Sequence, residues 1–374
     1  MKYAFSTLFT ICLLLCNTQP TQAGIFRKDY SKTIKKQFNI NPNGTARFSN
    51  QMGNMEVRTW NQNAVRVEVT IVVSAKNEDR AQDIFNRIDL DFSNSSNSVS
   101  VETEIEGGNN WSWGWNDNKG KDKFQVHYLV TAPSTLKFNL ENRYGNITTG
   151  QLDNDVLLDN SYGNVSLGDV NGNLKFELQY GNGQVGSVRN LTGELAYYKL
   201  NIRDADDVML DAQYSTFRAN NLRTFTADSR HNTFELGKME QFTYDGRYDN
   251  VEIGTAHRMT ADARYSTIHA ERVLDELRLD MRYGGVRVDQ LERGFSTAYL
   301  EGNYTDYHIV VAEGANFQLD AEAEYAGVRY PNGMEVTSEV EKGTSHHVKA
   351  YAGTPNARSV IRARLDYGGL RLTK

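Results

Sequence analysis

Residues 136–182 read LKFNLENRYGNITTGQLDNDVLLDNSYGNVSLGDVNGNLKFELQYGN, and this stretch decides the fold. Tyr144, Tyr162 and Tyr180 are 18 residues apart, and each is followed by glycine and asparagine. The spacing then continues in steps of 17 to 21 residues, with one double step before the last member, through Tyr197, Tyr214, His231, Tyr248, Tyr265, Tyr283, Tyr304, Tyr325 and Tyr367. A fixed period of about 20 residues is typical of stacked-repeat proteins.

Apolar and polar residues alternate around each tyrosine. The third and fifth residues after it are mostly apolar, and the second, fourth and sixth before it are apolar or small, as in Val208, Leu210 and Ala212 before Tyr214. This two-residue period is that of a half-buried strand. The glycine and asparagine that often follow tolerate the positive φ of a sharp turn. Each repeat therefore predicts a strand, a tight corner and a second short strand.

These repeats predict an all-β protein, a right-handed parallel β-solenoid (β-helix) of about twelve coils over residues 136–374. Successive coils would stack about 4.8 Å apart. Because the tyrosines share the parity of the apolar positions before them, we expect their rings to stack inside the coils, as core packing and not as a ligand site. His231 fits the same slot because imidazole is also flat. The longer steps near the C-terminus predict loops inserted on one side of the last coils.

Residues 24–135 lack the regular tyrosine repeat, and their sequence pattern predicts a small N-terminal α+β cap. Met52-Gly53-Asn54 matches the tyrosine corner, which predicts a degenerate first coil. Residues 77–88 have the apolar spacing of a short amphipathic helix. Residues 65–74, 98–105 and 124–132 read as strands, the last two around a polar loop over 106–123. Such a cap would cover the otherwise unpaired strand edge at the solenoid end.

Residues 1–23 have the features of a secretory signal peptide. Lys2 precedes a short apolar stretch, and small residues end the segment at Ala23. Both cysteines, Cys12 and Cys16, lie inside it, so the exported chain is expected to have no disulfide, catalytic thiol or cysteine-bound metal. Lipid attachment at Cys16 is the alternative, although Leu15 stands where a small residue is usual. The signal predicts export to the periplasm, the outer-membrane surface or the extracellular space.

The overall charge is mildly negative, with 41 Lys and Arg against 47 Asp and Glu. This balance argues against non-specific binding of nucleic acid. No segment has the length and apolar character of a transmembrane span.

With these motifs laid out, the chain resembles the bacterial putative-adhesin β-strand-repeat family. The resemblance rests on residues 52–57, the strand at 65–73 and residues 136–147, and it extends from about Phe38 to the C-terminus. It implies an exported, adhesin-like β-solenoid of unknown function. It supplies no catalytic residues, and the tyrosines are more regular here than in the looser family pattern.

A carboxylate stands three residues before nearly every tyrosine, and Arg364 takes this place only before the last. The acids are Glu141, Asp159, Glu177, Glu194, Asp211, Asp228, Asp245, Asp262, Asp280, Glu301 and Glu322. Parity places them outward and about 4.8 Å apart, a spacing at which like charges repel. In four successive repeats an arginine just before the corner can neutralise them, namely Arg230, Arg247, Arg264 and Arg282.

In four successive repeats nearer the N-terminus the arginine is absent, and the acids there are Asp159, Glu177, Glu194 and Asp211. We therefore hypothesise that they form a stripe that binds a cation or a basic partner. The alternative is a solvated acidic face that keeps the rod soluble. Carboxylates in a row also lack the six to eight converging oxygens of a tight calcium site.

A second candidate binding site is Trp111, Trp113 and Trp115, in a loop rich in glycine and asparagine. Exposed aromatic side chains in a loop suit stacking on sugar rings or insertion into a protein groove. The alternative is a strand that packs its three indoles on the cap or the solenoid.

Enzyme signatures are missing from the sequence, which contains no nucleophile elbow, zinc-protease helix motif, P-loop or dinucleotide fingerprint. We predict no catalytic residues, cofactor or metal site, and the adjacent His346 and His347 would point to opposite sides of a strand. The expected function is an exported, non-enzymatic, adhesin-like β-solenoid of the cell envelope. It would present a rigid surface to a protein or glycan partner.

Two other functions stay open at this point. The first is a carbohydrate-active enzyme, a polysaccharide lyase or hydrolase, on the same β-helix scaffold. Acids and a basic residue converging in a groove would favour it. The second is a periplasmic structural or sensing component. The identity of the partner and the oligomeric state are not encoded in any motif.

Overall fold

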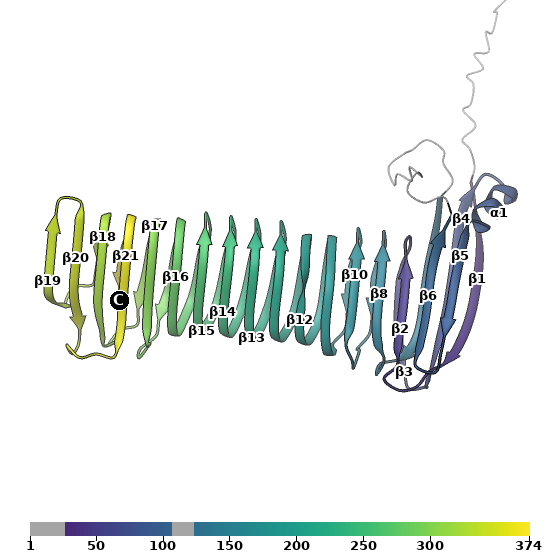
Figure 1. Cartoon of the computed structure of the whole chain (residues 1–374), viewed down its shortest axis with the longest axis horizontal. Coiled ribbons are helices and arrows are strands. Elements are labelled where there is room, and N and C mark those ends of the chain that lie inside the picture. Colours follow the sequence, from purple (N-terminus) through teal and green to yellow (C-terminus); the bar gives the residue numbers. More distant parts are fainter. Residues whose placement is uncertain (1–26, 107–122) are drawn as a thin grey trace, which may run out of the picture.

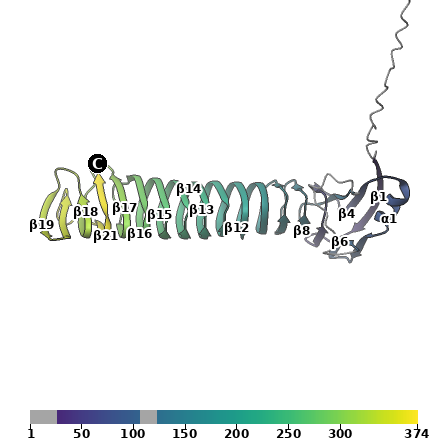
Figure 2. The same cartoon turned by 90° about the horizontal axis from the view of Figure 1, so that it is seen from above.

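The computed structural model describes residues 27–106 and 123–374. Within these ranges the chain is all-β with one helix, as predicted, and its strands lie side by side along one long axis (Figures 1 and 2). Strand β1 (Lys28–Asn39) and helix α1 (Glu78–Phe85) lie at one end of this rod, and β19 (Glu335–Lys342) lies at the other.

The predicted short helix is present as α1. Asn77 caps it, because its side-chain oxygen accepts a hydrogen bond from the Arg80 backbone N–H at 3.1 Å. Ala81, Ile84 and Phe85 turn its apolar face to the core. The strands around the helix are β2 (Thr45–Asn50), β3 (Met55–Trp60), β4 (Ala64–Ala75), β5 (Ile88–Asn94), β6 (Ser98–Ile105) and β7 (Lys123–Pro133).

The remaining strands carry the tyrosine repeats and the C-terminal hairpin. They are β8 (Lys137–Arg143), β9 (Ile147–Thr149), β10 (Val156–Ser161), β11 (Val165–Leu167), β12 (Val170–Gln213), β13 (Thr216–Arg230), β14 (Thr233–Arg247), β15 (Asn250–Arg264), β16 (Thr267–Leu291), β17 (Thr297–Val311), β18 (Phe317–Arg329), β20 (Ser345–Ala352) and β21 (Ser359–Thr373).

Neighbouring repeats pair in parallel and in strict register. In β13 and β14, Phe217 lies beside Phe234 and Asp228 beside Asp245. The pairing therefore stacks each residue on its counterpart in the next repeat. Strand β2 joins this register, with Phe48 beside Leu140 of β8, so the repeat begins before the first tyrosine, as predicted.

A single apolar core runs the length of the rod, from Ile40 to Leu372. It is built from the alternating positions identified in the sequence. In β13 these are Phe217, Phe225 and Ala227, all buried. Phe225 also stacks on Phe242 of the next repeat, with ring centroids 5.7 Å apart. Each buried phenylalanine side chain of this kind stabilises the fold by about 1.5–3 kcal/mol.

The predicted internal tyrosine stack is wrong, because the rings lie on the outside of the rod. Their exposed fraction runs from 36% at Tyr144 to 55% at Tyr325. All twelve corner residues, the eleven tyrosines and His231, have positive φ between 50° and 62°. This left-handed conformation interrupts the strand alternation, so the corner residue and the residue before it both face outward.

The rings still form a stack, but an external one. Successive centroids are 4.6 to 5.0 Å apart, and the rings are nearly parallel. We call this row of twelve rings the corner ladder. Left-handed backbone costs a non-glycine residue about 1–2 kcal/mol. Stacking returns about 0.5–1.5 kcal/mol per ring pair, so the ladder offsets much of the strain at its own corners.

In the middle repeats the residue after the corner is buried. Ser215, Asn232, Asp249 and Ser266 occupy this position and form a buried polar column. The backbone N–H of Tyr198 donates to Ser215 Oγ at 3.1 Å, and that of Ser215 to Asn232 Oδ1 at 2.8 Å. Asn232 N–H donates to Asp249 Oδ1 at 2.5 Å, and Asp249 N–H to Ser266 Oγ at 3.1 Å. Each side chain thus accepts from the backbone N–H of the residue after the corner in the preceding repeat, which burial would otherwise leave unpaired.

The buried Asp249 carboxylate is held by further donors. Tyr244 donates to its Oδ2 at 2.6 Å and Ser229 at 2.9 Å, while the Asn232 amide donates to Oδ1 at 3.1 Å. Burial, followed by the nearby Asp249 charge, raises the pKa of the Tyr244 phenol, which therefore stays a donor. These bonds supply the pairing that a buried carboxylate requires.

The C-terminal repeats are not stacked in chain order, contrary to the simple succession expected from the sequence. Strand β21 lies between β17 and β18 and pairs in parallel with both. The corner ladder therefore runs Tyr304, Tyr367, Tyr325. The double step before Tyr367 holds the antiparallel strands β19 and β20, which extend the sheet beyond β18 before the chain returns.

Replacing Tyr214 with alanine or glycine separates backbone strain from stacking. Both changes remove the ring, but only glycine relieves the left-handed backbone. We expect Tyr214→Gly to be more stable than Tyr214→Ala by about 1 kcal/mol, measured by thermal unfolding. Phe225→Ala, a true core truncation, should cost about 3–5 kcal/mol. A Tyr214→Ala loss as large as that of Phe225→Ala would contradict the external position of the ring.

Truncating Asn232 tests the buried polar column. Asn232→Ala removes the acceptor of Ser215 N–H and the donor to the Ala212 carbonyl at 2.8 Å. We expect the melting temperature to fall, with a free-energy loss of about 2–4 kcal/mol because buried partners stay unpaired. The matched change at the exposed Asn220 should cost less than about 0.5 kcal/mol. Equal losses at the two sites would show that the column does not stabilise the corners.

Candidate functional site

The acids placed outward by the sequence pattern form one continuous column on the rod. Register puts Asp159 between Glu141 and Glu177, and Asp211 beside Asp228. Parallel pairing at about 4.8 Å forces these carboxylates together, because each repeat contributes one at the same position.

A shallow groove of about 790 Å³ follows the N-terminal part of this column. We call it the N-terminal groove. All four acids of the hypothesised stripe line it, Asp159, Glu177, Glu194 and Asp211, together with Lys175, Leu157 and Met209. Leu157 is 44% exposed and Met209 is 59% exposed. The groove therefore combines a row of carboxylates with apolar side chains open to solvent.

Sequence reasoning missed Leu157 and Met209. Both stand five residues before a corner, at a position where neighbouring repeats have Asn139, Lys175 and Thr192. An apolar residue at an outward, otherwise polar position was the signal that could have identified them.

Crowding of negative charge is visible at Asp159. Partial burial raises the pKa of its carboxyl, and the charges of Glu177 and Glu141 raise it further, while Arg143 opposes them. The nearby cations therefore do not fully neutralise the negative charge of this part of the column.

The next part of the column is flanked by arginines, as the sequence indicated, although burial and the charge of Asp262 still raise the pKa of the Asp280 carboxyl. Arg230, Arg247, Arg264 and Arg282 lie in register beside one another, two residues from their acids. Arg282 Nε lies 3.9 Å from Asp280 Oδ1. The arginine row thus distinguishes this part of the column from the N-terminal groove.

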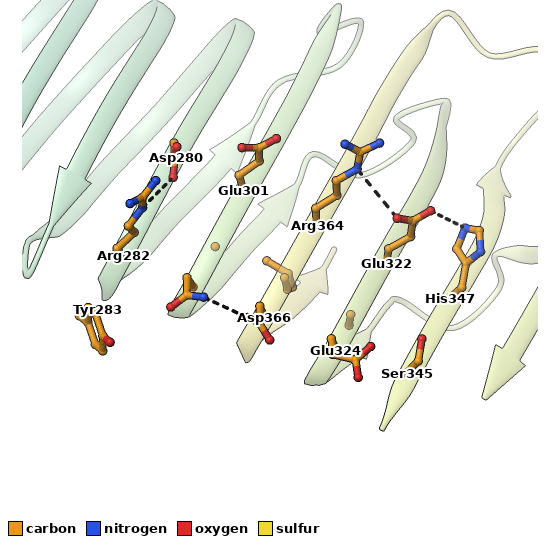
Figure 3. A pocket seen from close by; sticks show the side chains of 14 residues that line it. Asp280, Arg282, Tyr283, Glu301, Glu322, Glu324, Ser345, His347, Arg364 and Asp366 are labelled. Atoms are coloured by element: carbon orange, nitrogen blue, oxygen red, sulfur yellow. Dashed lines mark hydrogen bonds and ion pairs between the residues drawn. The ribbon is translucent and has the colours of Figure 1, made fainter. Parts of the chain in front are cut away.

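A second hollow, of about 900 Å³, lies near the C-terminal end (Figure 3). We call it the C-terminal groove. Arg364 comes between Glu301 and Glu322, because β21 is inserted there. Its Nε lies 3.9 Å from Glu322 Oε2, and His347 Nε2 lies 3.9 Å from Glu322 Oε1. Arg364 is therefore inside the acidic column, and not at its end as the sequence order suggested.

The corner ladder is a poor platform for sugar rings. Each phenol covers the face of its neighbour, so the ladder presents ring edges and hydroxyl groups to solvent. Stacking on a ligand would require free ring faces.

The adjacent histidines His346 and His347 contact acids on two different strands. His346 Nε2 lies 3.0 Å from Glu339 on β19, whereas His347 Nε2 lies 2.8 Å from Asp320 on β18. Among the described residues, no cluster of three or more histidine, cysteine or acidic side chains could hold a metal ion. In the same part of the chain, no helix has the length and apolar character to span a bilayer. Trp111, Trp113 and Trp115 lie outside the described residues.

Neutralising Asp159 should stabilise the protein at neutral pH. Its raised pKa means that the folded chain binds the proton more readily than the unfolded chain, so ionisation opposes folding. We expect Asp159→Asn to raise the melting temperature at neutral pH. The gain should shrink as the pH falls through the raised pKa toward the ordinary aspartate value.

Asp153 provides a control of opposite sign. A hydrogen bond from Ser134, followed by one from Gln151, lowers its pKa, so its ionised form favours folding. Asp153→Asn should lower the melting temperature at neutral pH, with a loss that shrinks as the pH falls through the ordinary aspartate value toward the lowered one. A lower melting temperature for Asp159→Asn at neutral pH would show that this carboxylate supports the fold.

Comparison with known proteins finds similar solved structures only. No family model and no curated protein matches the chain. A structure described as a "putative cell adhesion protein" from Clostridium sporogenes is 10% identical, with a TM-score of 0.18, and the match covers 91% of this chain and 99% of that one. "Putative adhesin" structures from Bacteroides fragilis and Parabacteroides merdae are 10% and 11% identical, with TM-scores of 0.21 and 0.26. These matches cover 91% and 69% of this chain and 97% and 96% of the others.

Proposed function

We propose that this protein is an exported, non-enzymatic, adhesin-like β-solenoid of the cell envelope that binds a partner along one face. The parallel register, repeating every 17 or 18 residues around one core, supports a right-handed winding of about twelve coils. Such a rod is rigid, because nearly every repeat is hydrogen-bonded on both sides.

The N-terminal groove is the observation on which this proposal rests. It is the stretch of the column where carboxylates lack the arginine row and where Leu157 and Met209 are open to solvent. Lysine or arginine side chains would pair with the acids, and apolar side chains between them would cover the leucine and methionine. The chemistry therefore fits a protein segment that alternates basic and apolar residues.

Export to the envelope is supported by the signal-like segment at residues 1–23 and by the resemblance to the adhesin-like family. The partner is then another envelope or surface molecule. A protein segment suits the groove better than a glycan, because the groove is lined by carboxylates, Leu157 and Met209, and its one aromatic lining residue, Phe176, is buried and offers sugars no free ring face.

Two matched pairs of substitutions test this binding site. Glu177→Gln with Glu194→Gln removes two charges from the N-terminal groove, whereas Asp245→Asn with Asp262→Asn removes two from the arginine-flanked part. The probes are a peptide alternating lysine with leucine, a peptide alternating lysine with serine, and a glycan array. We expect the lysine–leucine peptide to bind most tightly. The first pair should weaken its binding about tenfold, and the second pair should leave it unchanged.

Either of two results would contradict the proposal. Equal losses for the two pairs would show that the peptide senses only overall charge. Binding to glycans with no binding to either peptide would assign the rod to a carbohydrate partner. Titration calorimetry gives the affinities, and thermal unfolding confirms that all variants are folded.

A second candidate function is a polysaccharide lyase or hydrolase acting in the C-terminal groove. The observation in its favour is the convergence of Glu301, Glu322, Arg364 and His347 around one hollow. Incubation with uronic-acid polysaccharides would release unsaturated products or new reducing ends. Such activity should disappear in Glu322→Gln and survive in Glu252→Gln, at an exposed position elsewhere on the rod. Absence of any product would leave the binding function as the sole candidate.

A further inference from the structure

The two ends of the rod are open strand edges. Within the described ranges, β1 pairs only with β4 and β5 only with β6 at one end, and β19 pairs only with β20 at the other. An edge strand presents a row of backbone N–H and C=O groups that can pair with another strand. These edges belong to the same sheet, so a strand added at either end would continue it (Figure 1).

The β1 edge at the N-terminal end is basic, whereas the other edge strand there, β5, carries Asp89 and Asp91. Strand β1 contains four lysines, Lys28, Lys32, Lys35 and Lys36, against one acid, Asp29. Lys32 lies opposite the buried Ile71, and Lys36 opposite the buried Val67. Residues paired across strands lie on one face of the sheet, so these lysines stand on the core side at the open end. Lys36 Nζ lies 3.9 Å from the centroid of the Phe92 ring.

The C-terminal edge is acidic. Strand β19 contains Glu335, Glu339 and Glu341 against one base, Lys342, and all its residues are exposed. Glu339 lies opposite the buried Val348, which places it on the core side at this end. Two valines on the same strand, Val336 and Val340, are 43% and 54% exposed.

From these charges we propose that copies of this chain associate head to tail, with β1 of one copy pairing against β19 of the next. The opposite charges of the edges favour this pairing, and like charges disfavour the pairing of two identical ends. Apolar residues of both edges would be covered, and the sheet would run from rod to rod. A head-to-tail interface gives a ring if the rotation between copies closes and a filament if it does not, and joining the opposite ends of straight rods favours the filament. This inference is independent of the proposed partner site.

Lysines on an edge strand can also serve to prevent pairing, and this alternative makes the opposite prediction. If the lysines only protect the edge, replacing them should leave association unchanged or increase it. If they recognise β19, the same replacement should abolish an existing association. If the lysines recognise β19, association should be stronger at low ionic strength, because salt screens the attraction between exposed charges.

The experiment uses the purified chain in analytical ultracentrifugation, with electron microscopy of the same samples. We expect concentration-dependent assemblies at low salt, seen as rods joined end to end, that dissociate at high salt. Lys28→Glu with Lys32→Glu should weaken association at least about tenfold, and so should Glu335→Lys with Glu341→Lys. Lys199→Glu with Lys238→Glu, which makes the same charge change in the middle of the rod, should have no effect.

Mixing supplies the decisive comparison. The lysine-reversed variant has two acidic ends and the glutamate-reversed variant has two basic ends, so neither assembles alone. Together they should assemble again, with the two variants alternating along the filament. Unchanged melting temperatures would show that both variants are folded.

Three results would overturn the inference. The chain could stay monomeric at every concentration at low salt. Assemblies could persist unchanged after reversal of either end, which would indicate association along the sides. Association could increase in the lysine-reversed variant alone, which would show that β1 protects its edge.

Discussion

The structure depends on a corner at which a tyrosine takes the left-handed backbone conformation. That conformation changes which side of the strand faces the core, and it is unfavourable for a residue with a Cβ. The cost is tolerable here because every ring is stacked on the ring of the next repeat. One tyrosine alone would gain nothing from the arrangement. The regular spacing of the tyrosines, and the replacement of one by the flat ring of His231, follow from this mutual dependence.

Once the corners are aligned, every other column follows from register. The residue after the corner points inward and builds the polar column of Ser215, Asn232 and Asp249. The residue three before the corner points outward and builds the acidic column. The surface chemistry of the rod is therefore set position by position. The N-terminal groove differs from the rest of the column at two positions of the repeat. The position just before the corner has no arginine there, and the position five residues before the corner has the exposed Leu157 and Met209 in two of the repeats.

Much of this arrangement could be predicted from the sequence, because parallel pairing turns a sequence period directly into a spatial one. The strands, the helix capped by Asn77 and the acidic column follow from local patterns. The side taken by the tyrosines was predicted wrongly, although the sequence held the signal. The inward positions lie two residues before and three residues after the corner, and this odd separation of five cannot fit an unbroken alternation.

Other features depend on pairings between distant residues. The position of β21 between β17 and β18 could not be predicted, since a double step of the period is compatible with either order. Strand β1 was not predicted, and its Tyr30, Ile34 and Phe38 recur every four residues, a spacing that is closer to that of a helix than of a strand. Its strand conformation comes from pairing with β4. The C-terminal groove depends on the same insertion of β21, so its combination of acids with Arg364 was hidden in the linear order.

Residue-resolved chemical modification of tyrosine tests the external corner ladder most directly. The chain contains its own internal comparison, since Tyr128, Tyr198, Tyr244 and Tyr307 are buried while the ladder tyrosines are about half exposed. Nitration of the folded protein, followed by mass spectrometry of its peptides, should modify the ladder and leave these four until the chain unfolds. Protection of the ladder tyrosines to the same degree as the buried four would contradict the account.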